Sequence, residues 1–333
     1  MAAAALCLGL AACDNEEEPV AQPSIAPTPE PPPVCPLNGT DIPKGMKVKR
    51  SAVAIKVENS PDSRPQSGLE DAEVVYEEIV EGGITRFMAI FHCTDSKKIG
   101  PVRSARFDDP KIAKPFTRVL AFSGGNAIVE RELNDRNMIP LQENDAGASL
   151  YRVPPGVLEL HNLFADTKQL RKLKSVKKAR PPREGIFDFA PVPDSAKKAR
   201  RVSMNFTSSN TIEYRWKKGA WRRYEAGAPF QSATKGQIAV PNLLIQKVTV
   251  NNSPKIVDSA GNPSPDITLK GKGKALLFRD GRVQVGRWKI SKEGRPAIFT
   301  SNDGQAFAFE RGPIWIELVP SKGGQVKGSV TYR

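Results

Sequence analysis

The hydrophobic and polar positions of the chain divide it into two regions with different periodicities. From Val53 to about Leu170, continuous apolar runs alternate with segments whose apolar residues recur at helical spacing. After Arg201, short segments alternate apolar and polar residues in steps of two, and turn residues separate them. This pattern predicts an α/β layered N-terminal domain followed by an antiparallel all-β C-terminal domain.

The N-terminal region contains distinct signals for individual elements. Residues 84–93 (ITRFMAIFHC) are almost all apolar, which is typical of a strand covered on both faces. Residues 68–80 begin with small and acidic residues and then become apolar, which predicts a helix leading into a strand. The other expected elements are a strand at 52–59 that ends in a turn, an extended segment at 98–106, a helix, buried strand and glycine turn over 107–125, and an amphipathic helix at 126–137.

Turn residues organise the C-terminal region into hairpins. Residues 203–225 predict two or three short strands, with a turn at Lys218–Gly219. Asp280–Gly281 is the strongest hairpin signal of the chain, and Asp303–Gly304 is a second one. Several further alternating segments follow the same pattern, so we expect this half to consist of antiparallel strands.

The first residues read as a secretory leader. The apolar run MAAAALCLGLAA stops at Cys13 and is followed at once by acidic residues, and it is too short to span a membrane. Leu10-Ala11-Ala12-Cys13 has the form of a lipobox, in which the cysteine is acylated and becomes the mature N-terminus. The alternative is a soluble protein with an apolar tail. We therefore expect an extracytoplasmic lipoprotein that is anchored to the membrane through the lipid on Cys13.

Composition divides the rest of the chain. The segments are a signal peptide at 1–12, an acidic and proline-rich tether at 13–34, the α/β domain at 35–175, a basic, proline-containing linker at 176–200 and the all-β domain at 201–333.

The cysteines that remain are expected to pair. Cys7 lies in the leader and Cys13 is the lipidation site, which leaves Cys35 and Cys93. In an exported protein two such cysteines most simply form a disulfide, here closing a loop of about 58 residues. Two free buried thiols are the alternative. The spacing offers no paired ligands for zinc, so no metal site is expected.

The charge of the chain is +14 and is concentrated between Lys168 and Arg223. In a cytoplasmic protein such a stretch would suggest nucleic acid. Outside the cell the anionic partners are lipid headgroups, polymer phosphates and lipid-linked precursors, so no nucleic-acid partner is expected. A solvated linker between domains explains the same charges without any partner.

Arginines in the N-terminal region are the main candidates for a binding site. Arg64, Arg86, Arg103 and Arg106 lie in segments that are otherwise poor in long polar side chains, and Ser104 stands between the last two. The planar guanidinium fork suits phosphate or carboxylate groups. Alternatively, these arginines form internal salt bridges with the nearby acidic residues Glu78, Glu81, Asp108 and Asp109.

Further candidates for the binding site follow these arginines in the sequence. Gly124 and Asn126 belong to a strand-to-helix turn whose backbone amides could receive an anion. His161 and Asn162 could donate to a phosphate, and His161 could act as a general acid or base. His92 is expected to be a packing residue. No complete catalytic constellation is visible, so the catalytic residues are unknown.

The motifs ENSPDSRPQSGLEDAEVVYEEIVEGGITRFMAIFHC, KIGPVRSAR, AFSGG and HNLF resemble the YerB-like bacterial lipoprotein family. The resemblance extends over most of residues 35–320 and implies two domains, but it implies no activity. The order of the apolar strand, KIGPVRSAR and the Gly-Gly turn is also similar to the LytR-CpsA-Psr envelope phosphotransferases. That second similarity would make Arg86, Arg103 and Arg106 a pyrophosphate clamp and Asp108 or Glu81 magnesium ligands.

The sequence therefore predicts an envelope lipoprotein that binds an anionic envelope polymer or lipid-linked precursor through an arginine-lined cleft, without a cofactor. The alternatives are a magnesium-dependent phosphotransferase or hydrolase acting on a polyprenyl-phosphate-linked glycan, and a non-catalytic envelope assembly factor.

Overall fold

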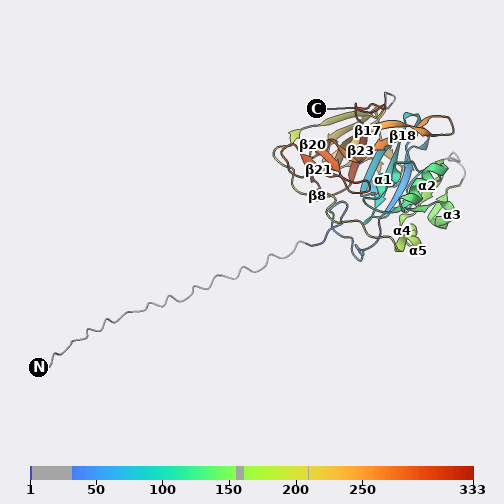
Figure 1. The fold of residues 1–333 in the computed structure, drawn as a ribbon, viewed down its shortest axis with the longest axis horizontal. Helices are drawn as coiled ribbons and strands as arrows, with labels where there is room; N and C mark the ends of the chain where they lie inside the picture. The colour runs from blue at the N-terminus through green and yellow to red at the C-terminus, as the bar shows by residue number, and fades with distance from the viewer. Residues whose placement is uncertain (2–31, 155–160, 209) are drawn as a thin grey trace. The chain divides into compact units, whose positions relative to one another are not determined.

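The computed structural model describes Met1 and residues 32–154, 161–208 and 210–333. The chain divides into two units, Met1–Pro32 and Pro33–Arg333. The second unit contains all the helices and strands named below, and Figure 1 shows its course. The predicted leader, apart from Met1, and the predicted lipidation site Cys13 lie outside the described residues, as does the tether up to residue 31.

A single large sheet runs through the second unit. Within the described residues it has 12 strands. Ten of them follow one another across the sheet in the order β21 (Ile298–Ser301), β20 (Arg282–Ile290), β19 (Gly271–Arg279), β17 (Asn242–Val257), β23 (Ile314–Pro320), β2 (Val74–Ile79), β3 (Thr85–Phe91), β1 (Val53–Glu58), β4 (Val119–Ala121) and β5 (Ile139–Leu141). In addition, β18 (Pro263–Thr268) pairs with β17 and β9 (Lys197–Lys198) pairs with β20.

The strand β23 joins the two halves of the chain in this sheet. It pairs in parallel with β17 on one side and with β2 on the other. The expectation of a wholly antiparallel C-terminal half is therefore wrong at this strand. The parallel pairing accords with burial: all seven residues of β23 are buried, and strands in parallel pairings are typically covered on both faces.

A second sheet is formed by the C-terminal half, and short strand pairs complete the structure. The second sheet contains β13 (Ala228–Pro229), β12 (Ala220–Glu225), β11 (Ile212–Lys217), β10 (Arg201–Asn205) and β24 (Ser329–Tyr332) in that order, with β16 (Ala239–Val240) paired to β12. The short pairs are β14 (Gln231–Ser232) with β15 (Gly236–Gln237), β22 (Ala308–Phe309) with β8 (Asp188–Phe189), and β6 (Leu150–Arg152) with β7 (Leu163–Ala165).

Two of the turn signals of the sequence, Asp280–Gly281 and Lys218–Gly219, are confirmed as hairpins. Asp280 and Gly281 connect β19 to β20 with φ values of 49° and 62°, as a tight two-residue hairpin turn requires. Lys218 and Gly219 connect β11 to β12 with φ values of 53° and 73°.

Helices are few and short, and they gather in the cyan and green part of the chain in Figure 1. The α-helices are α1 (Asp109–Ala113), α2 (Ala127–Asp135), α3 (Glu143–Ala146), α4 (Thr167–Leu170) and α5 (Lys174–Lys177). Single 3₁₀ turns occur at η1 (Pro61–Ser63), η2 (Leu69–Asp71), η3 (Glu81–Gly83) and η4 (Gly147–Ser149). In the part of the chain that the structure describes, none of the helices has the length and apolar character needed to cross a membrane.

Most elements expected in the N-terminal region are present. The strand at 84–93, the helix and strand over 107–125 and the amphipathic helix at 126–137 correspond to β3, α1 with β4, and α2. The helix expected within 68–80 is wrong, because only the turn η2 precedes β2. Every residue of β2 is buried and its two edges pair with β3 and β23, which favours a strand over a helix.

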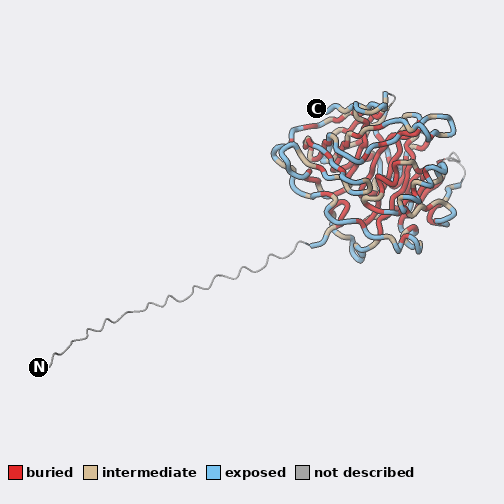
Figure 2. The backbone as a smooth tube through the Cα atoms, in the orientation of Figure 1, coloured by how far each residue is buried: buried red, intermediate tan, exposed pale blue. Residues whose placement is uncertain are grey.

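The buried residues form one continuous core across both halves. Figure 2 shows the buried residues concentrated in the interior of the folded unit and the exposed residues mainly at its outside. The core combines apolar residues of β1, β2 and β3 with those of β17, β19 and β23, and it includes the second-sheet residues Tyr214 and Trp221. The two sheets therefore pack as one body.

A buried ionic cluster stands between the two sheets. Arg223 of β12 is completely buried, and its Nη1 donates to Glu77 Oε2 at 2.6 Å. The same Nη1 lies 3.3 Å from Glu317 Oε1, and Nη2 lies 2.9 Å from Glu225 Oε2. Glu77 of β2 and Glu317 of β23 are partners in the parallel register. Arg223 therefore ties the second sheet to the seam between the two halves.

The raised pKa of Glu317 and the aromatic rings around Arg223 reduce the cost of burying this cluster. Burial, followed by the neighbouring Glu77 carboxylate, raises the pKa of Glu317 well above its ordinary range. The hydroxyl of Tyr214 donates to Glu317 Oε1 at 2.6 Å. The guanidinium carbon of Arg223 also lies within cation–π distance of four rings, those of Phe230, Phe87, Tyr214 and Trp315.

Replacing Arg223 with methionine should destabilise the protein by about 3–5 kcal/mol, because it leaves buried carboxylates without their cation. The free energy of unfolding in urea measures this loss. Arg222→Met is the matched control, since Arg222 lies on the same strand and forms no ion pair within the described residues. Its effect should stay within about 0.5 kcal/mol. Equal losses in the two variants would contradict a special role for the Arg223 cluster.

Candidate functional site

A cleft of about 410 Å³ brings together most of the arginines that the sequence singled out. It is lined on one side by Arg86 of β3 and by the loop residues Arg103, Ser104 and Arg106. Asn126, at the start of α2, closes a second side. The remaining lining residues are Glu81, Ala105, Gly125, Val129, Val257, Asp258 and Ser259.

Arg86 is the most deeply placed of these arginines. It lies directly opposite Glu58 of β1 and Glu78 of β2, so the three side chains project from the same face of the sheet. Only 6% of Arg86 is exposed, and its Nη1 donates to the carbonyl of Ser104 at 3.0 Å. Its Nε has no hydrogen-bond partner in the described part of the chain, where Arg86 also forms no ion pair. Burial and then the nearby Arg106 lower the pKa of Arg86 to about 9.

Arg103 and Arg106 are each held by one carboxylate. Arg103 Nε lies 3.1 Å from Glu58 Oε2, and Arg106 Nε donates to Glu81 Oε2 at 2.5 Å. The backbone fixes the loop as well, because the amide of Arg103 donates to the carbonyl of Lys56 at 2.9 Å. The cleft and the salt bridges that the sequence offered as alternatives are therefore both present, with Glu58 and Glu81 as the actual partners.

His161 lies behind the cleft. Its Nδ1 is 2.7 Å from Glu58 Oε2, the same oxygen that Arg103 approaches. His161 does not line the cleft, and only 8% of it is exposed. Its place in the structure is that of a residue that positions Glu58, and through Glu58 the guanidinium of Arg103.

Three further predicted residues are occupied by structural contacts. Asn126 Oδ1 accepts the amides of Ile128 and Val129, each at 3.0 Å, and so caps α2. The carbonyl of Gly124 accepts the amide of Ala105 at 2.8 Å, and its φ of 134° favours glycine at this position. Asn162 Oδ1 accepts from Arg152 Nη1 at 2.7 Å, away from the cleft.

Arg64 does not join the other arginines. Its Nη2 donates to Glu225 Oε1 at 2.5 Å and to the carbonyl of Asn59 at 2.8 Å. It lines a separate hollow of about 310 Å³. The grouping of Arg64 with the cleft is therefore wrong, because its anionic partner belongs to the second sheet.

A buried charged layer beneath the cleft was not predicted from the sequence. Lys56 Nζ contacts Glu78 and also Asp109 Oδ1, the latter at 2.6 Å. Burial lowers the pKa of Lys56 to about 8. Glu78 and Asp109 thus pair with Lys56 and not with the guanidinium groups of the arginines, although Asp109 Oδ2 accepts the backbone amide of Arg106 at 2.7 Å. The signal was a lysine between the apolar residues Ile55 and Val57 of a buried strand.

The carboxylates proposed for magnesium do not converge. Asp108 Oδ1 is 2.6 Å from Lys111 Nζ, and Asp108 Oδ2 accepts the amide of Ile267 at 2.8 Å. Glu81 lines the cleft but is taken by Arg106 and by the hydroxyl of Ser264. In the described segments, no group of three metal-ligating side chains meets at the cleft.

The predicted disulfide between Cys35 and Cys93 is confirmed, with a Cα–Cα distance of 6.0 Å. The buried carboxyl of Glu73 lies beside it and accepts the amide of Cys93 at 2.8 Å. Because both sulfurs are in the disulfide, this group offers no thiolate to a metal. Burial raises the pKa of Glu73 to about 7. His92 is a packing residue as predicted, since it is fully buried and burial lowers its pKa to about 4.

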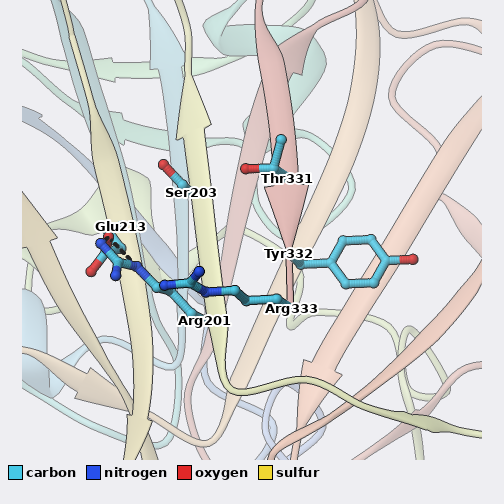
Figure 3. Close-up of a pocket in the computed structure, with 6 residues that line it drawn as sticks. All are labelled: Arg201, Ser203, Glu213, Thr331, Tyr332 and Arg333. Atoms are coloured by element: carbon cyan, nitrogen blue, oxygen red, sulfur yellow. Dashed lines mark hydrogen bonds and ion pairs between the residues drawn. The ribbon is translucent and has the colours of Figure 1, made fainter.

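A hollow on the second sheet is a weaker candidate. It measures about 310 Å³ and is lined by residues of β10, β11 and β24, among them Arg201, Glu213 and Arg333. Figure 3 shows the side chains of Arg201 and Arg333 side by side, while Tyr332 points away from them. Arg201 Nε donates to Glu213 Oε2 at 2.6 Å. The guanidinium of Arg201 is thereby neutralised, which reduces the attraction of this hollow for an anion.

Together, these features define a class of disulfide-bonded, strand-rich proteins in which an N-terminal and a C-terminal half share one sheet. Two family models match the chain, "Protein of unknown function (DUF3048) N-terminal domain" at residues 37–180 and the corresponding C-terminal domain at residues 201–316. The chain belongs to this family. The match confirms the resemblance to YerB-like proteins that the sequence motifs indicated.

A relative and a solved structure from Bacillus subtilis agree with this assignment. The chain is 30% identical over 280 residues to a Bacillus subtilis (strain 168) protein named "Putative lipoprotein YerB", and the match covers 82% of each chain. The crystal structure of YerB protein from Bacillus subtilis is similar to this fold with a TM-score of 0.71 and 27% identity. That match covers 90% of this chain and all of the other.

Replacing Cys35 and Cys93 together with serine should lower the free energy of unfolding by about 2–5 kcal/mol, because the unfolded chain loses a long covalent loop. Denaturant titrations with and without reductant measure the effect. Reductant should lower the stability of the wild-type protein to that of the variant and leave the variant unchanged. If the denaturation midpoint of the wild-type protein were the same with and without reductant, the disulfide would not contribute to stability.

Glu73 should make stability depend on pH. Its pKa of about 7 in the folded protein exceeds its ordinary value, so the folded state binds the proton more tightly. The resulting stabilisation is complete below the unfolded pKa and is lost as pH rises through about 7. Relative to Glu73→Gln, the wild-type protein should lose on the order of 3 kcal/mol between pH 4 and 8. Urea unfolding at stepped pH tests this, and parallel pH profiles would contradict it.

Proposed function

We propose that this protein is a membrane-anchored envelope lipoprotein whose arginine cleft binds a ligand bearing phosphate or carboxylate groups. Anchoring is supported by the lipobox Leu10–Cys13 and by the name of the Bacillus subtilis relative. The disulfide between Cys35 and Cys93 supports an oxidising compartment. The Pro-rich segment before Cys35 would then serve as a spacer between the membrane and the folded unit.

The unpaired charge of Arg86 is the observation that carries the binding proposal. A buried guanidinium is costly unless an anion meets it. Arg103 and Arg106 have carboxylate partners, whereas Arg86 has only the Ser104 carbonyl among the described residues. Burial, followed by the nearby Arg106, lowers the pKa of Arg86, and the attraction of Glu81 and Glu58 offsets this only in part. An anion in the cleft would supply the missing charge.

The surroundings of Arg86 favour a phosphate-sized anionic group. The N-terminus of α2 opens on the cleft through Gly125 and Asn126, and the positive end of a helix favours anions. Arg103 and Arg106 border the same space and could add donors from their guanidinium forks. At about 410 Å³ the cleft accommodates one phosphate or pyrophosphate group with the first part of its carrier. This fits a wall polymer or a lipid-linked precursor.

The magnesium-dependent transferase receives less support from the geometry. Asp108 is turned to Lys111 and to the amide of Ile267, and it does not line the cleft. Of the two candidate ligands only Glu81 lines the cleft, where Asp258 is a further carboxylate, and Glu81 is already paired with Arg106. We therefore favour binding over catalysis at this site.

Arg86→Met should weaken binding of inorganic pyrophosphate and of a short poly(glycerol phosphate) by about tenfold or more, since a charge-assisted hydrogen bond contributes about 1.5–3 kcal/mol. Its unfolding free energy should change by less than about 1 kcal/mol, because the variant removes an unpaired buried charge. Isothermal titration calorimetry at low ionic strength and urea unfolding provide the two readouts.

The control for this experiment is Arg287→Met, an exposed arginine of β20 that forms no ion pair within the described residues. The double variant Arg103→Ala/Arg106→Ala should show the same loss of binding as Arg86→Met. If both cleft variants bind the two probes as the wild-type protein does, the cleft is not the binding site.

A further inference from the structure

A second basic groove lies outside the arginine cleft. It measures about 540 Å³ and is built from three segments that are distant in the sequence, 114–118, 180–183 and 292–295. The first segment follows α1, the second follows α5, and the third connects β20 to β21. The groove contains part of the stretch 176–200, whose composition predicted a linker.

The charge of this groove is strongly one-sided. Five of its basic residues are exposed: Arg118, Arg180, Arg183, Lys292 and Arg295. Glu293 is the carboxylate of the lining, and its Oε2 is already 2.6 Å from Arg136 Nη1. Within the described residues, none of the five exposed cations forms an ion pair, and Arg118 donates to the carbonyl of Asn137 at 2.5 Å. The groove therefore presents a surplus of positive charge to solvent.

The groove has a fixed shape because its floor belongs to the core. Phe116 is 3% exposed and stacks on Phe187 with ring centroids 6.2 Å apart. The hydroxyl of Thr117 donates to the carbonyl of Ala52 at 2.6 Å. Gly294 lies so close to Lys114 that a Cβ there would be 3.0 Å from the lysine Cδ. Of these contacts, the Phe116–Phe187 stacking is the one that fixes the stretch 176–200 to the floor of the groove.

Two early residues of the folded unit contact the stretch that precedes and follows the groove segment 180–183. The backbone of Gly39 lies against the ring of Phe189, just beyond Phe187. The hydroxyl of Ser51 donates to the carbonyls of Val176 and Ala179, at 2.8 and 2.5 Å. Gly39 and Ser51 thus contact the chain just after and just before the segment that carries Arg180 and Arg183. Exposed lysines of and next to α5 extend the basic surface: Lys174, Lys177 and Lys178.

We infer that this basic groove binds the phosphodiester headgroups of anionic phospholipids at the surface of a bilayer. A lipid anchor on Cys13 would hold the folded unit, and with it the groove, close to a membrane surface, so this inference rests on the anchoring part of the proposed function. Exposed basic clusters near a bilayer add to the binding provided by an acyl chain. The exposed arginines supply the attraction, and the apolar floor at Phe116 keeps the groove open.

Vesicle co-sedimentation tests this inference. The probe is a vesicle of phosphatidylglycerol and phosphatidylcholine, compared with pure phosphatidylcholine, and the protein is residues 13–333 with Cys13→Ser so that no acyl chain contributes. The wild-type sequence should bind the anionic vesicles at low salt, lose binding as salt rises, and ignore the neutral ones. Arg180→Ala/Arg183→Ala/Arg295→Ala should bind about 100-fold more weakly, because three surface cations are removed.

A matched control separates the groove from total charge. Lys217→Ala/Lys255→Ala/Lys327→Ala removes three exposed cations that lie on other elements and form no ion pair among the described residues. It should bind vesicles within about threefold of the wild-type protein. Equal losses in both triple variants, or unchanged binding by the groove variant, would overturn the inference. So would binding of free poly(glycerol phosphate) at the groove without any binding of vesicles.

The same variants separate this inference from the arginine cleft. Arg86→Met should bind anionic vesicles normally, and the groove variant should bind pyrophosphate normally. Far-ultraviolet circular dichroism and thermal melting show that each variant is folded, which is expected because the three substituted arginines are exposed.

Discussion

The buried Arg223 is the constraint on which the architecture depends. It contacts Glu77 from the N-terminal half, Glu317 from the C-terminal half and Glu225 of its own strand. An ionic group in this position requires all its partners at once, because the cost of burying an unpaired charge exceeds most other single contributions to stability. The cluster therefore selects one register for the β2–β23 seam and one placement of the second sheet over it.

Strand alternation lets the same two strands serve both this cluster and the cleft. Successive residues of a strand point to opposite faces of the sheet. On β2, Glu77 faces Arg223, whereas Glu78 contacts Lys56 beneath the cleft. On β3, Phe87 packs against Arg223 and the preceding Arg86 faces the cleft. One face thus holds the sheets together, and the other positions the arginines whose ligand we propose.

The sequence indicated the local elements better than their assembly. The apolar run of β3, the helix α2 and the Asp280–Gly281 hairpin follow from short-range patterns. The pairing of β23 with β2 did not, because nothing in either segment encodes a partner so distant in the chain. Likewise, Arg86, Arg103 and Arg106 were recognised as a group. Of their expected partners Glu81 does pair with Arg106, whereas Glu58, the partner of Arg103, was not among them. Glu58 and the layer around Lys56 come from a strand whose register only the folded sheet reveals.

The parallel pairing of β2 with β23 also has a consequence for how the chain acquires its structure. Val74 pairs with Ile314, so the second edge of β2 stays unpaired until β23, one of the last strands of the chain, has been synthesised. Such non-local contacts slow folding. All residues of β2 are buried in the folded protein, so as long as its edge is unpaired the strand can pair with other chains. A chain exported from its N-terminus would expose this edge until its final segment emerged, and a chain cut short before β23 would keep it exposed permanently.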